Sequence, residues 1–179
     1  MPRYGMLINT RRCIGCYACR LACQMANETA LDTSFIRYQT LETGTYPHVR
    51  AEQVPLQCMH CEDAPCVGVC PTGASYINAD GVVLIDTDRC IGCRYCMVAC
   101  PYDARVVNEA DGTVEKCIFC VFNDDGSVPE PNCVRTCVAK ARIFGDLDDP
   151  TSDISQAIIK YNAKPLNEDL TKAKIFYVR

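Results

Sequence analysis

The sequence predicts an α+β fold that is rich in loops, with short strands and short helices rather than long regular elements. Three observations support this class. Sixteen cysteines in 179 residues fall into four tight groups, the longest aliphatic run spans only positions 82–85, and a segment containing one cysteine group recurs later in the chain. A chain of this length suits one or two compact domains, so each domain is expected to be organised around cysteine groups.

Every cysteine belongs to one of the four groups, and none is left over. Neighbouring cysteines within a group are three to five residues apart, except for one gap of thirteen positions in the last group, between Cys120 and Cys133. Such complete use argues against incidental placement. The groups are Cys13, Cys16, Cys19 and Cys23; Cys58, Cys61, Cys66 and Cys70; Cys90, Cys93, Cys96 and Cys100; and Cys117, Cys120, Cys133 and Cys137.

The third group reads Cys-Ile-Gly-Cys-Arg-Tyr-Cys-Met-Val-Ala-Cys-Pro, which is the cysteine run that holds [4Fe–4S] clusters in bacterial ferredoxins. Three thiolates from one tight loop reach three corners of a cuboidal cluster, and Gly92 lets the backbone curl close to the inorganic core. The fourth cysteine, Cys100, points away from the loop and in two-cluster ferredoxins ligates the neighbouring cluster. Four groups therefore predict four [4Fe–4S] clusters, with all sixteen cysteines as iron ligands.

Two other uses of cysteine fit these residues less well. Disulfides between such close neighbours would form small, strained loops that constrain the unfolded chain little. A structural zinc site joins two Cys-x-x-Cys pairs, whereas three successive cysteines at a spacing of three crowd one tetrahedral ion. The second group alone, or the fourth with its long gap, is also compatible with zinc. Because they occur in the same chain as the first and third groups, we favour iron–sulfur clusters for all four.

Two internal repeats indicate that one structural unit has been duplicated. Residues 7–16 match 84–93, and the Cys-Pro-x-x-Ala segment at 70–74 recurs at 100–104. An alanine also stands four residues after Cys137, as it does after Cys70 and Cys100. The repeated unit is expected to consist of a strand, a cluster loop, a short helix and a strand.

The secondary structure expected along the chain follows from this unit. Segments 6–9 and 82–86 are predicted strands that lead into cluster loops, and the second follows an Asp-Gly turn. Segments 16–27 and 93–100 are predicted helical turns, the latter ended by a proline. Ser152 or Asp153 is expected to cap a helix over 154–161. Further predicted strands cover 36–41, 105–108, 142–145 and 174–178, and an exposed loop is predicted over 121–132.

In a ferredoxin each cluster takes three ligands from one group and the fourth from its partner group. The second and third groups are separated by only nineteen residues with a strand–turn–strand pattern, so we pair these two. The outer groups then pair by elimination, which leaves open a pairing of the third group with the fourth, since these are also close in sequence. The expected ligand sets are Cys58, Cys61, Cys66 and Cys100; Cys90, Cys93, Cys96 and Cys70; Cys13, Cys16, Cys19 and Cys137; and Cys117, Cys120, Cys133 and Cys23.

This pairing divides the chain into two bacterial-ferredoxin-like modules with two [4Fe–4S] clusters each. The outer module comprises 1–50 and 101–146, the inner module 51–100, and residues 147–179 form a C-terminal docking tail. Cys23 and Cys137 lack the proline that usually follows the last cysteine, so unequal reduction potentials are expected. These departures leave open that the cluster of Cys117, Cys120, Cys133 and Cys23 is the most exposed or the most labile.

The titratable residues outside the cysteine groups have simple interpretations. His48 and His60 are expected at the surface, and the alternative for His60 is a hydrogen bond that tunes the second group's cluster. Several of the eighteen Lys and Arg lie within three residues of a cysteine. They are either solvated charges or, as we favour, they offset the negative charge of thiolate-ligated clusters. Among them are Arg12, Arg20, Arg89, Arg94, Lys116 and Arg135.

Several function classes are not supported by the sequence. Its net charge is −4 and its basic residues are dispersed, which argues against nucleic-acid binding. It has no dinucleotide or phosphate-loop fingerprint and no recognisable nucleophile–base pair. No segment approaches the ~20 apolar residues of a membrane span, and the first residues do not read as a cleavable signal. Arg11-Arg12 precedes a cysteine loop, unlike a twin-arginine signal. We therefore expect a relay of electrons without a substrate pocket of its own.

The motifs resemble those of a known family. Cys-Met-His-Cys-Glu-Asp-Ala-Pro-Cys, Ala-Cys-Pro-Tyr-Asp-Ala-Arg, Glu-Lys-Cys-Ile-Phe-Cys and Phe-Gly-Asp-Leu-Asp-Asp-Pro are similar to the four-cluster beta subunits of molybdopterin oxidoreductases. The polysulfide, thiosulfate, arsenate, tetrathionate and dimethyl sulfoxide reductases are the nearest types, and the resemblance covers nearly the whole chain. It implies a non-catalytic electron-transfer subunit with the same outer-with-outer and inner-with-inner pairing.

The resemblance also implies partners and a location. A large catalytic subunit would carry molybdenum or tungsten bis-pterin, and some members also dock on a membrane-embedded quinol-binding subunit. Export in complex with a catalytic subunit that carries the signal would place the protein on the extracytoplasmic, periplasmic face of the membrane; cytoplasmic members are the alternative. A rival hypothesis from another class is an independent soluble polyferredoxin that carries electrons between several enzymes.

Overall fold

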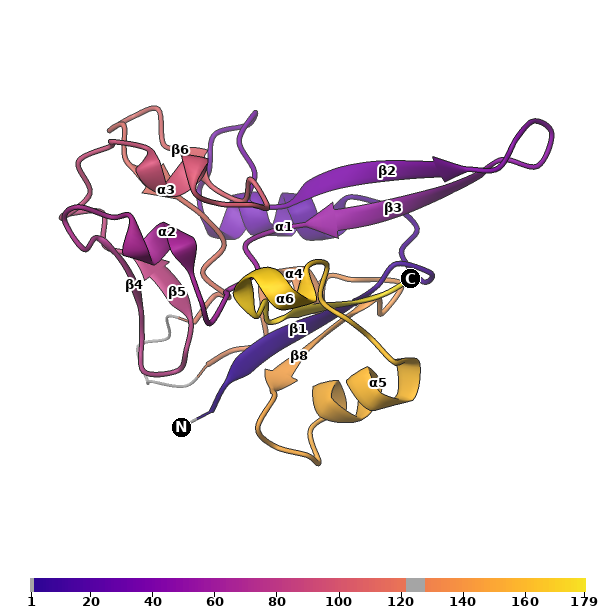
Figure 1. Cartoon of the computed structure of the whole chain (residues 1–179). Coiled ribbons are helices and arrows are strands. Elements are labelled where there is room, and N and C mark those ends of the chain that lie inside the picture. Colours follow the sequence, from indigo (N-terminus) through magenta and orange to yellow (C-terminus); the bar gives the residue numbers. More distant parts are fainter. Residues whose placement is uncertain (1, 122–127) are drawn as a thin grey trace.

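A computed structural model of the protein describes residues 2–121 and 128–179. At its centre is a three-stranded sheet of β1 (Tyr4–Asn9), β8 (Arg142–Asp146) and β9 (Ile175–Val178). β1 lies between the other two, antiparallel to β8 and parallel to β9 (Figure 1). The N-terminal strand is therefore held by two strands from the C-terminal part of the sequence.

Both faces of this sheet are covered. Met6, Leu7 and Ile8 of β1 are all fully buried, as expected for a strand whose apolar run is continuous rather than alternating. Leu7 shares a core cluster with Ile154 of helix α5 (Asp153–Tyr161), while Met6 and Ile8 belong to the core that contains the cysteines. The sheet thus fixes one wall of the cysteine-rich interior.

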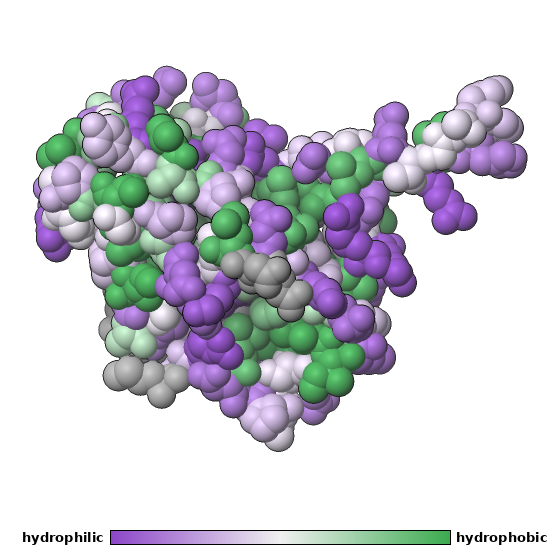
Figure 2. All heavy atoms as spheres, in the orientation of Figure 1, coloured by the Kyte–Doolittle hydropathy of each residue, from purple (hydrophilic) through white to green (hydrophobic). Residues whose placement is uncertain are grey.

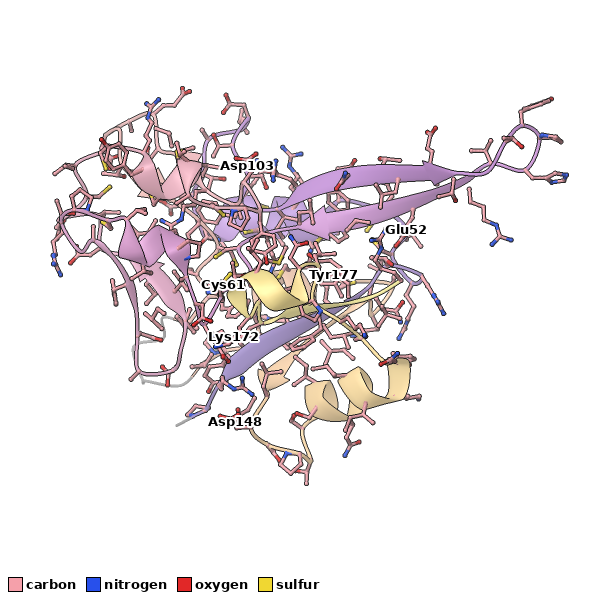
Figure 3. The ribbon with its side chains drawn as sticks, in the orientation of Figure 1. Glu52, Cys61, Asp103, Asp148, Lys172 and Tyr177 are labelled. Atoms are coloured by element: carbon pink, nitrogen blue, oxygen red, sulfur yellow. The ribbon has the colours of Figure 1, made fainter. Side chains whose placement is uncertain are left out.

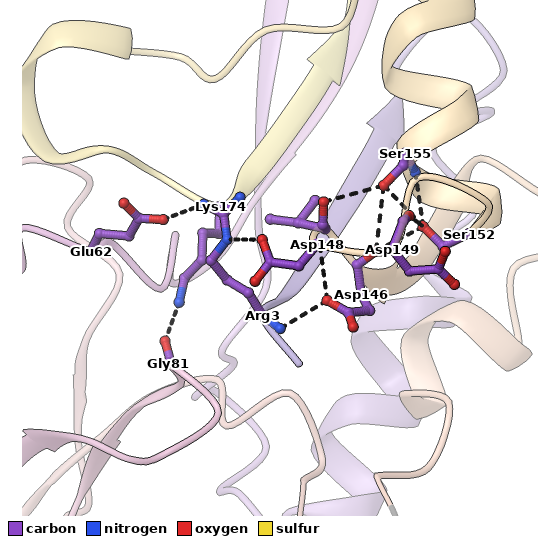
Figure 4. A network of polar contacts seen from close by, with 10 residues as sticks. Arg3, Glu62, Gly81, Asp146, Asp148, Asp149, Ser152, Ser155 and Lys174 are labelled. Carbon is purple, nitrogen blue, oxygen red and sulfur yellow. Dashed lines mark hydrogen bonds and ion pairs between the residues drawn. The ribbon is translucent and has the colours of Figure 1, made fainter. Parts of the chain in front are cut away.

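Helix α5 begins where the sequence predicts. The Ser152 hydroxyl accepts a hydrogen bond from the backbone N–H of Ser155, which satisfies one of the free donors of the first turn. A polar network anchors the same region (Figure 4): Arg3 binds both Asp148 and Glu62. The N-terminus, the second cysteine group and the segment after β8 are joined at this point.

The remaining elements are short. α1 to α4 each lie within or at the end of one of the four cysteine groups, and the other strands form three hairpins. The helices are α1 (Ala18–Ala26), α2 (Pro65–Gly68), α3 (Tyr95–Val98), α4 (Asn132–Arg135) and α6 (Glu168–Thr171). The hairpins pair β2 (Arg37–Thr43) with β3 (Arg50–Leu56), β4 (Ser75–Ile77) with β5 (Val83–Ile85), and β6 (Val106–Val107) with β7 (Val114–Glu115).

The β2–β3 hairpin extends away from the body as an arm (Figure 1). Most of its side chains are exposed or half-buried, and at its tip Tyr46 is 92% exposed. The base of the arm is apolar: Val54 is buried in the main core. The arm is therefore anchored at one end and open to solvent at the other.

The mixture of short helices, short strands and loops agrees with the predicted α+β class. The closing strand expected over 174–178 is β9, and the strand candidates at 6–9, 36–41, 82–86, 105–108 and 142–145 each contain or overlap an observed strand. Of the loop predicted over 121–132, residues 122–127 lie outside the described part, and α4 begins at Asn132. The division into modules stays a prediction; its boundary at 50/51 falls at the start of β3. In the described ranges no helix has the length and apolarity needed to cross a bilayer.

Candidate metal centres

The two Cys-Ile-Gly-Cys loops adopt the same backbone conformation. Gly15 and Gly92 have φ of 64° and 66°, and two residues later Tyr17 and Arg94 have φ of 61° and 62°. These left-handed residues curl each loop tightly before α1 and α3 begin. The sequence repeat is therefore also a structural repeat, and it presents three cysteines of one loop to a common point.

Centre 1 is the cavity between the first loop and the segment that leads into β8. Ile8, Tyr38 and Arg142 also line it. Cys16 is exposed, and Cys19 is buried. The cysteines that line this cavity are Cys13, Cys16, Cys19 and Cys137.

Centre 2 lies deeper. Helix α4 packs against α1, which brings the last cysteine of the first group to the fourth group. Phe35 and Phe119 also line the cavity. The cysteines that line it are Cys23, Cys117, Cys120 and Cys133.

The sequence left open that centre 2 is the most exposed of the four. That interpretation is wrong, because three of its cysteines are buried and Cys120 is half-buried. The packing of α4 on α1 and the two phenylalanine rings outweigh the irregular spacing of the fourth group. The exposed cysteines are instead Cys16 of centre 1 and Cys93 of centre 4.

Centres 3 and 4 are formed by the second and third groups. Cys70 lines one cavity together with Cys90, Cys93 and Cys96, which makes centre 4. In centre 3 the thiol of Cys61 interacts electrostatically with Cys58, Cys66 and Cys100. In all four centres the structure brings three cysteines of one group to the last cysteine of the partner group that the sequence predicts.

The C-terminal segment closes centre 3. The Thr171 side chain at the end of α6 hydrogen-bonds Cys61 and Tyr102, and Cys61 lies beside this helix in Figure 3. The backbone N–H of Lys174 donates to the carbonyl of Met59 at 2.9 Å, within the second cysteine group. The segment after residue 147 thus shapes a metal centre as well as the sheet.

The chemistry of these donor sets fits a positively charged iron–sulfide core. Burial, together with Cys133 and Cys120, raises the pKa of Cys23 to about 12, and burial raises the pKa of Cys61 and Cys133 to about 11. Four thiolates gathered this closely repel one another and need a cation to stay ionised. Within the described ranges no three His, Cys, Asp or Glu side chains are close enough to hold a single ion. Sulfurs set around a cavity instead fit the corners of a cubane.

Hydrogen-bond donors already point at several of these sulfurs. The backbone N–H groups of Ser75 and Ala141 lie 3.4 Å and 3.2 Å from the sulfurs of Cys70 and Cys137. The Tyr38 hydroxyl lies 2.9 Å from the sulfur of Cys19. Such donors stabilise a ligating thiolate and raise the reduction potential of a cluster.

The cations near the cysteines differ from one another in burial. Of the six named there, Lys116 is buried, Arg20 is half-buried and the other four are exposed. Two buried arginines were missed, Arg105 and Arg142. Both lie five residues after the last cysteine of a group and follow the repeated alanine. Their equivalent positions in the internal repeat could therefore have identified them from the sequence.

His60 corrects another expectation, whereas His48 is exposed as predicted. The His60 ring is fully buried and stacks on Phe119 with 3.7 Å between ring centroids. Burial and the nearby Lys116 lower its pKa well below the usual value, so the ring is neutral at pH 7. Surface exposure was the wrong prediction because an aromatic ring from a distant group covers this loop.

Three electrostatic interactions indicate which centres are neighbours. Arg142 interacts with Cys19 of centre 1 and Cys133 of centre 2. Cys117 of centre 2 interacts with Cys58 of centre 3. Arg105 interacts with the thiols of centres 3 and 4. The four centres therefore follow the order 1–2–3–4.

Comparisons with known proteins agree with this geometry. Models of the 4Fe-4S dicluster domain match residues 12–74 and 49–147. The B subunit of tetrathionate reductase from Salmonella typhimurium is 41% identical, over 98% of this chain and 72% of its own length. The B component of polysulfide reductase from Wolinella succinogenes is 40% identical, over 98% of this chain and 94% of its own length. The iron–sulfur subunit of arsenate respiratory reductase from Shewanella sp. ANA-3 is 35% identical, over 99% and 96%.

This protein belongs to the iron–sulfur beta subunits of the molybdopterin oxidoreductase family. The assignment confirms the resemblance read from the cysteine motifs. As a member of this family the protein is an electron-transfer subunit rather than a catalytic one. Two dicluster domains with sixteen cysteines carry four [4Fe–4S] clusters, the number that the sequence predicts.

Proposed function

We propose that the four cysteine sets each ligate one [4Fe–4S] cluster and that the row of centres relays electrons between two partners at its ends. The observation that carries this proposal is the series of electrostatic interactions from centre 1 to centre 4, which link thiols of neighbouring centres directly or through a buried arginine. Electron transfer falls steeply with distance, so a row of adjacent clusters conducts where a single long step does not. The two bacterial-ferredoxin-like modules of the proposal are centres 1 and 2 and centres 3 and 4.

The ends of the row differ from its middle in solvent access. Centre 1 and centre 4 each have one exposed cysteine, Cys16 and Cys93, whereas the centre 2 and centre 3 cysteines are buried or half-buried. Electrons then enter and leave through centres 1 and 4. Clusters shielded from water in the middle lose no electrons to side reactions.

Exposed apolar side chains surround both ends. Ile14 is 68% exposed beside centre 1, and Ile91 and Val98 are 67% and 88% exposed beside centre 4. Figure 2 shows apolar residues on the lobe that carries α2 and α3. Apolar patches of this kind are typical of surfaces that dock on other proteins. We assign one end to a large molybdopterin-containing catalytic subunit, and the other to a second redox partner such as a membrane-embedded quinol-binding subunit.

The β2–β3 arm favours the hypothesis of a subunit in a complex over that of an independent electron carrier. It stands clear of the body in Figure 2, and its tip residue Tyr46 is almost wholly exposed. An independent polyferredoxin has little use for such an arm, whereas a partner subunit can enclose it. The segment after Asp146, by contrast, is packed on β1 as α5 and β9, so it does not discriminate between the two hypotheses.

We further propose that the complex works on the extracytoplasmic face of the membrane, exported with the catalytic subunit; a cytoplasmic complex is the alternative. Protease treatment of spheroplasts tests this directly. Extracytoplasmic protein is digested while a cytoplasmic marker enzyme stays intact, and protection of both overturns the assignment.

The function itself is tested on the native protein purified without oxygen. We expect a complex larger than the 19.8 kDa chain, with a pterin-containing partner and about sixteen iron and sixteen sulfide per copy of this protein. Addition of the partner's substrate should oxidise the reduced clusters. A lone protein that shuttles electrons between unrelated enzymes would favour the polyferredoxin, and a zinc-loaded protein would overturn both.

A further inference from the structure

Two buried arginines occupy equivalent places in the two modules. Arg105 and Arg142 are each 4% exposed. Each follows the last cysteine of its group by five residues, in Cys-Pro-Tyr-Asp-Ala-Arg and Cys-Val-Ala-Lys-Ala-Arg. The duplicated unit thus carries one buried guanidinium in each pair of centres.

Arg142 lies between centres 1 and 2. Its Nη1 donates to the side-chain oxygen of Gln57 at 2.7 Å and lies 3.8 Å from the sulfur of Cys133. The guanidinium also faces Cys19 and lines the cavity of centre 1. Its Nη2 is buried, and none of the described residues accepts a hydrogen bond from it.

Arg105 has the same relation to centres 3 and 4. Its Nη2 donates to the Ser75 hydroxyl at 2.9 Å, and its Nη1 is buried and has no partner of its own in the described ranges. The side chain also donates to the thiols of Cys66 and Cys96. Burial raises the pKa of Cys66 and of Cys96, and Arg105 opposes that rise in both. These two thiols belong to different centres, and Arg105 also lines the cavity of centre 4, so the guanidinium lies between the pair.

Neither guanidinium is paired with a carboxylate among the ion pairs of the described residues. An uncompensated buried charge costs several kcal/mol, so an anion must lie nearby in the native protein. Four thiolates around a [4Fe–4S] core carry a net charge of about −2 by formal counting, and reduction adds one more negative charge. The clusters themselves supply the missing anion and the missing acceptors.

We propose that Arg105 and Arg142 are positioning residues for electron transfer, each donating from its free nitrogen to sulfur of the clusters on either side. A cation there stabilises the reduced state of both clusters in a pair. It therefore raises the reduction potentials of both clusters by similar amounts. Electron transfer between the two clusters of a module then stays close to isoenergetic. This inference rests on the proposed ligation of clusters by the four cysteine sets.

Lys116 lies at the remaining junction, between centres 2 and 3, but is not equivalent. Its ammonium donates to the carbonyl oxygens of Val83 and Cys117, so two of its three hydrogens are used by the backbone. The two arginines, in contrast, combine a buried charge with a buried donor that has no acceptor among the described residues. The effect is accordingly expected within each module rather than between modules.

The test is a potentiometric titration of the anaerobically purified complex, followed by electron paramagnetic resonance. Centres are assigned by the signal that each cysteine variant removes. At a fixed applied potential, Arg142→Gln should lower the reduced-to-oxidised ratio of centres 1 and 2 at least tenfold. This corresponds to reduction potentials lower by about 59 mV for one electron, and centres 3 and 4 should stay unchanged. Arg105→Gln should do the reverse.

Exposed arginines beside the same loops give matched controls. Arg12→Gln and Arg89→Gln each remove an exposed guanidinium, next to the first cysteine of its loop, that water already screens, so their titrations should stay within about a twofold ratio of the wild type. If Arg142→Gln fails to assemble clusters, Arg142→Lys carries the test. Its ammonium lacks the planar fork, so it should shift centres 1 and 2 by less than the tenfold ratio given above and by unequal amounts.

Unchanged potentials in the glutamine variants, or in Arg142→Lys where Gln does not assemble, overturn the inference. So does an equal shift of all four centres, which would indicate a general loss of packing. The proposed function fails separately, because it requires four signals and about sixteen irons in the wild type before any variant is compared.

Discussion

The two Cys-Ile-Gly-Cys loops have the same sequence and the same backbone, yet alanine in place of their glycines should have different effects. Both glycines are left-handed, with φ of 64° at Gly15 and 66° at Gly92. That conformation costs an alanine roughly 1–2 kcal/mol at either site. The difference comes from what the new methyl group meets.

At Gly92 the added Cβ would lie 2.7 Å from the backbone oxygen of Gly112, in the turn between β6 and β7. Relief requires a backbone shift, and overpacking of this kind costs about 1–3 kcal/mol more. At Gly15 the Cβ would lie 3.0 Å from Cγ of Gln53, a side chain on the arm that can move aside. We therefore expect a total of about 2–5 kcal/mol for Gly92→Ala and about 1–2 kcal/mol for Gly15→Ala.

The assay is the rate at which an iron chelator removes centre 4 from Gly92→Ala and centre 1 from Gly15→Ala, each relative to the same centre in the wild type. If the loop must open before the chelator attacks, the acceleration of cluster loss should be at least ten times larger in Gly92→Ala than in Gly15→Ala. Gly15→Ala combined with Gln53→Ala should lose centre 1 no faster than Gly15→Ala alone. Equal acceleration in the two glycine variants, or a larger one in Gly15→Ala, would refute the reasoning from these contacts.

Other substitutions test the scaffold and the arm. Ser152→Ala removes the cap of α5 and should destabilise the protein by about 0.5–2 kcal/mol, seen as a lower Tm with iron content unchanged. Ile154→Ala empties the fully buried contact of α5 with the sheet and should cost about 2–5 kcal/mol; a Tm equal to that of the wild type would contradict the packing. Tyr46→Ser at the tip of the arm should weaken retention of the partner subunit while all clusters are kept, whereas Leu31→Ser, equally exposed elsewhere, should not.

The sets of cysteines that the structure brings together could be predicted because iron ligation imposes a spacing. A cubane needs three sulfurs from one short loop, so the pattern appears in the sequence without reference to the rest of the fold. The strand β1 was equally readable, since Met6, Leu7 and Ile8 form a continuous apolar run. In both cases the requirement is local in the sequence.

The features that were missed depend on distant contacts. His60 is buried only because Phe119, from another cysteine group, stacks on it. Centre 2 is shielded because α4 packs on α1. Strand β3 was not expected because an arm largely open to solvent needs no alternation of apolar and polar residues. Arg105 was missed for another reason, since it lies beyond the immediate neighbourhood of any cysteine in the sequence.

The most direct test of the account is which cysteines share a cluster. Cys58→Ser and Cys100→Ser should each remove the same one of the four paramagnetic signals, and Cys90→Ser and Cys70→Ser should each remove a second one. A variant that loses a cubane should retain about twelve irons per copy of the protein instead of about sixteen. If Cys100→Ser removed the signal that Cys90→Ser removes, the crossed arrangement of thiols, and with it the row of centres, would be contradicted.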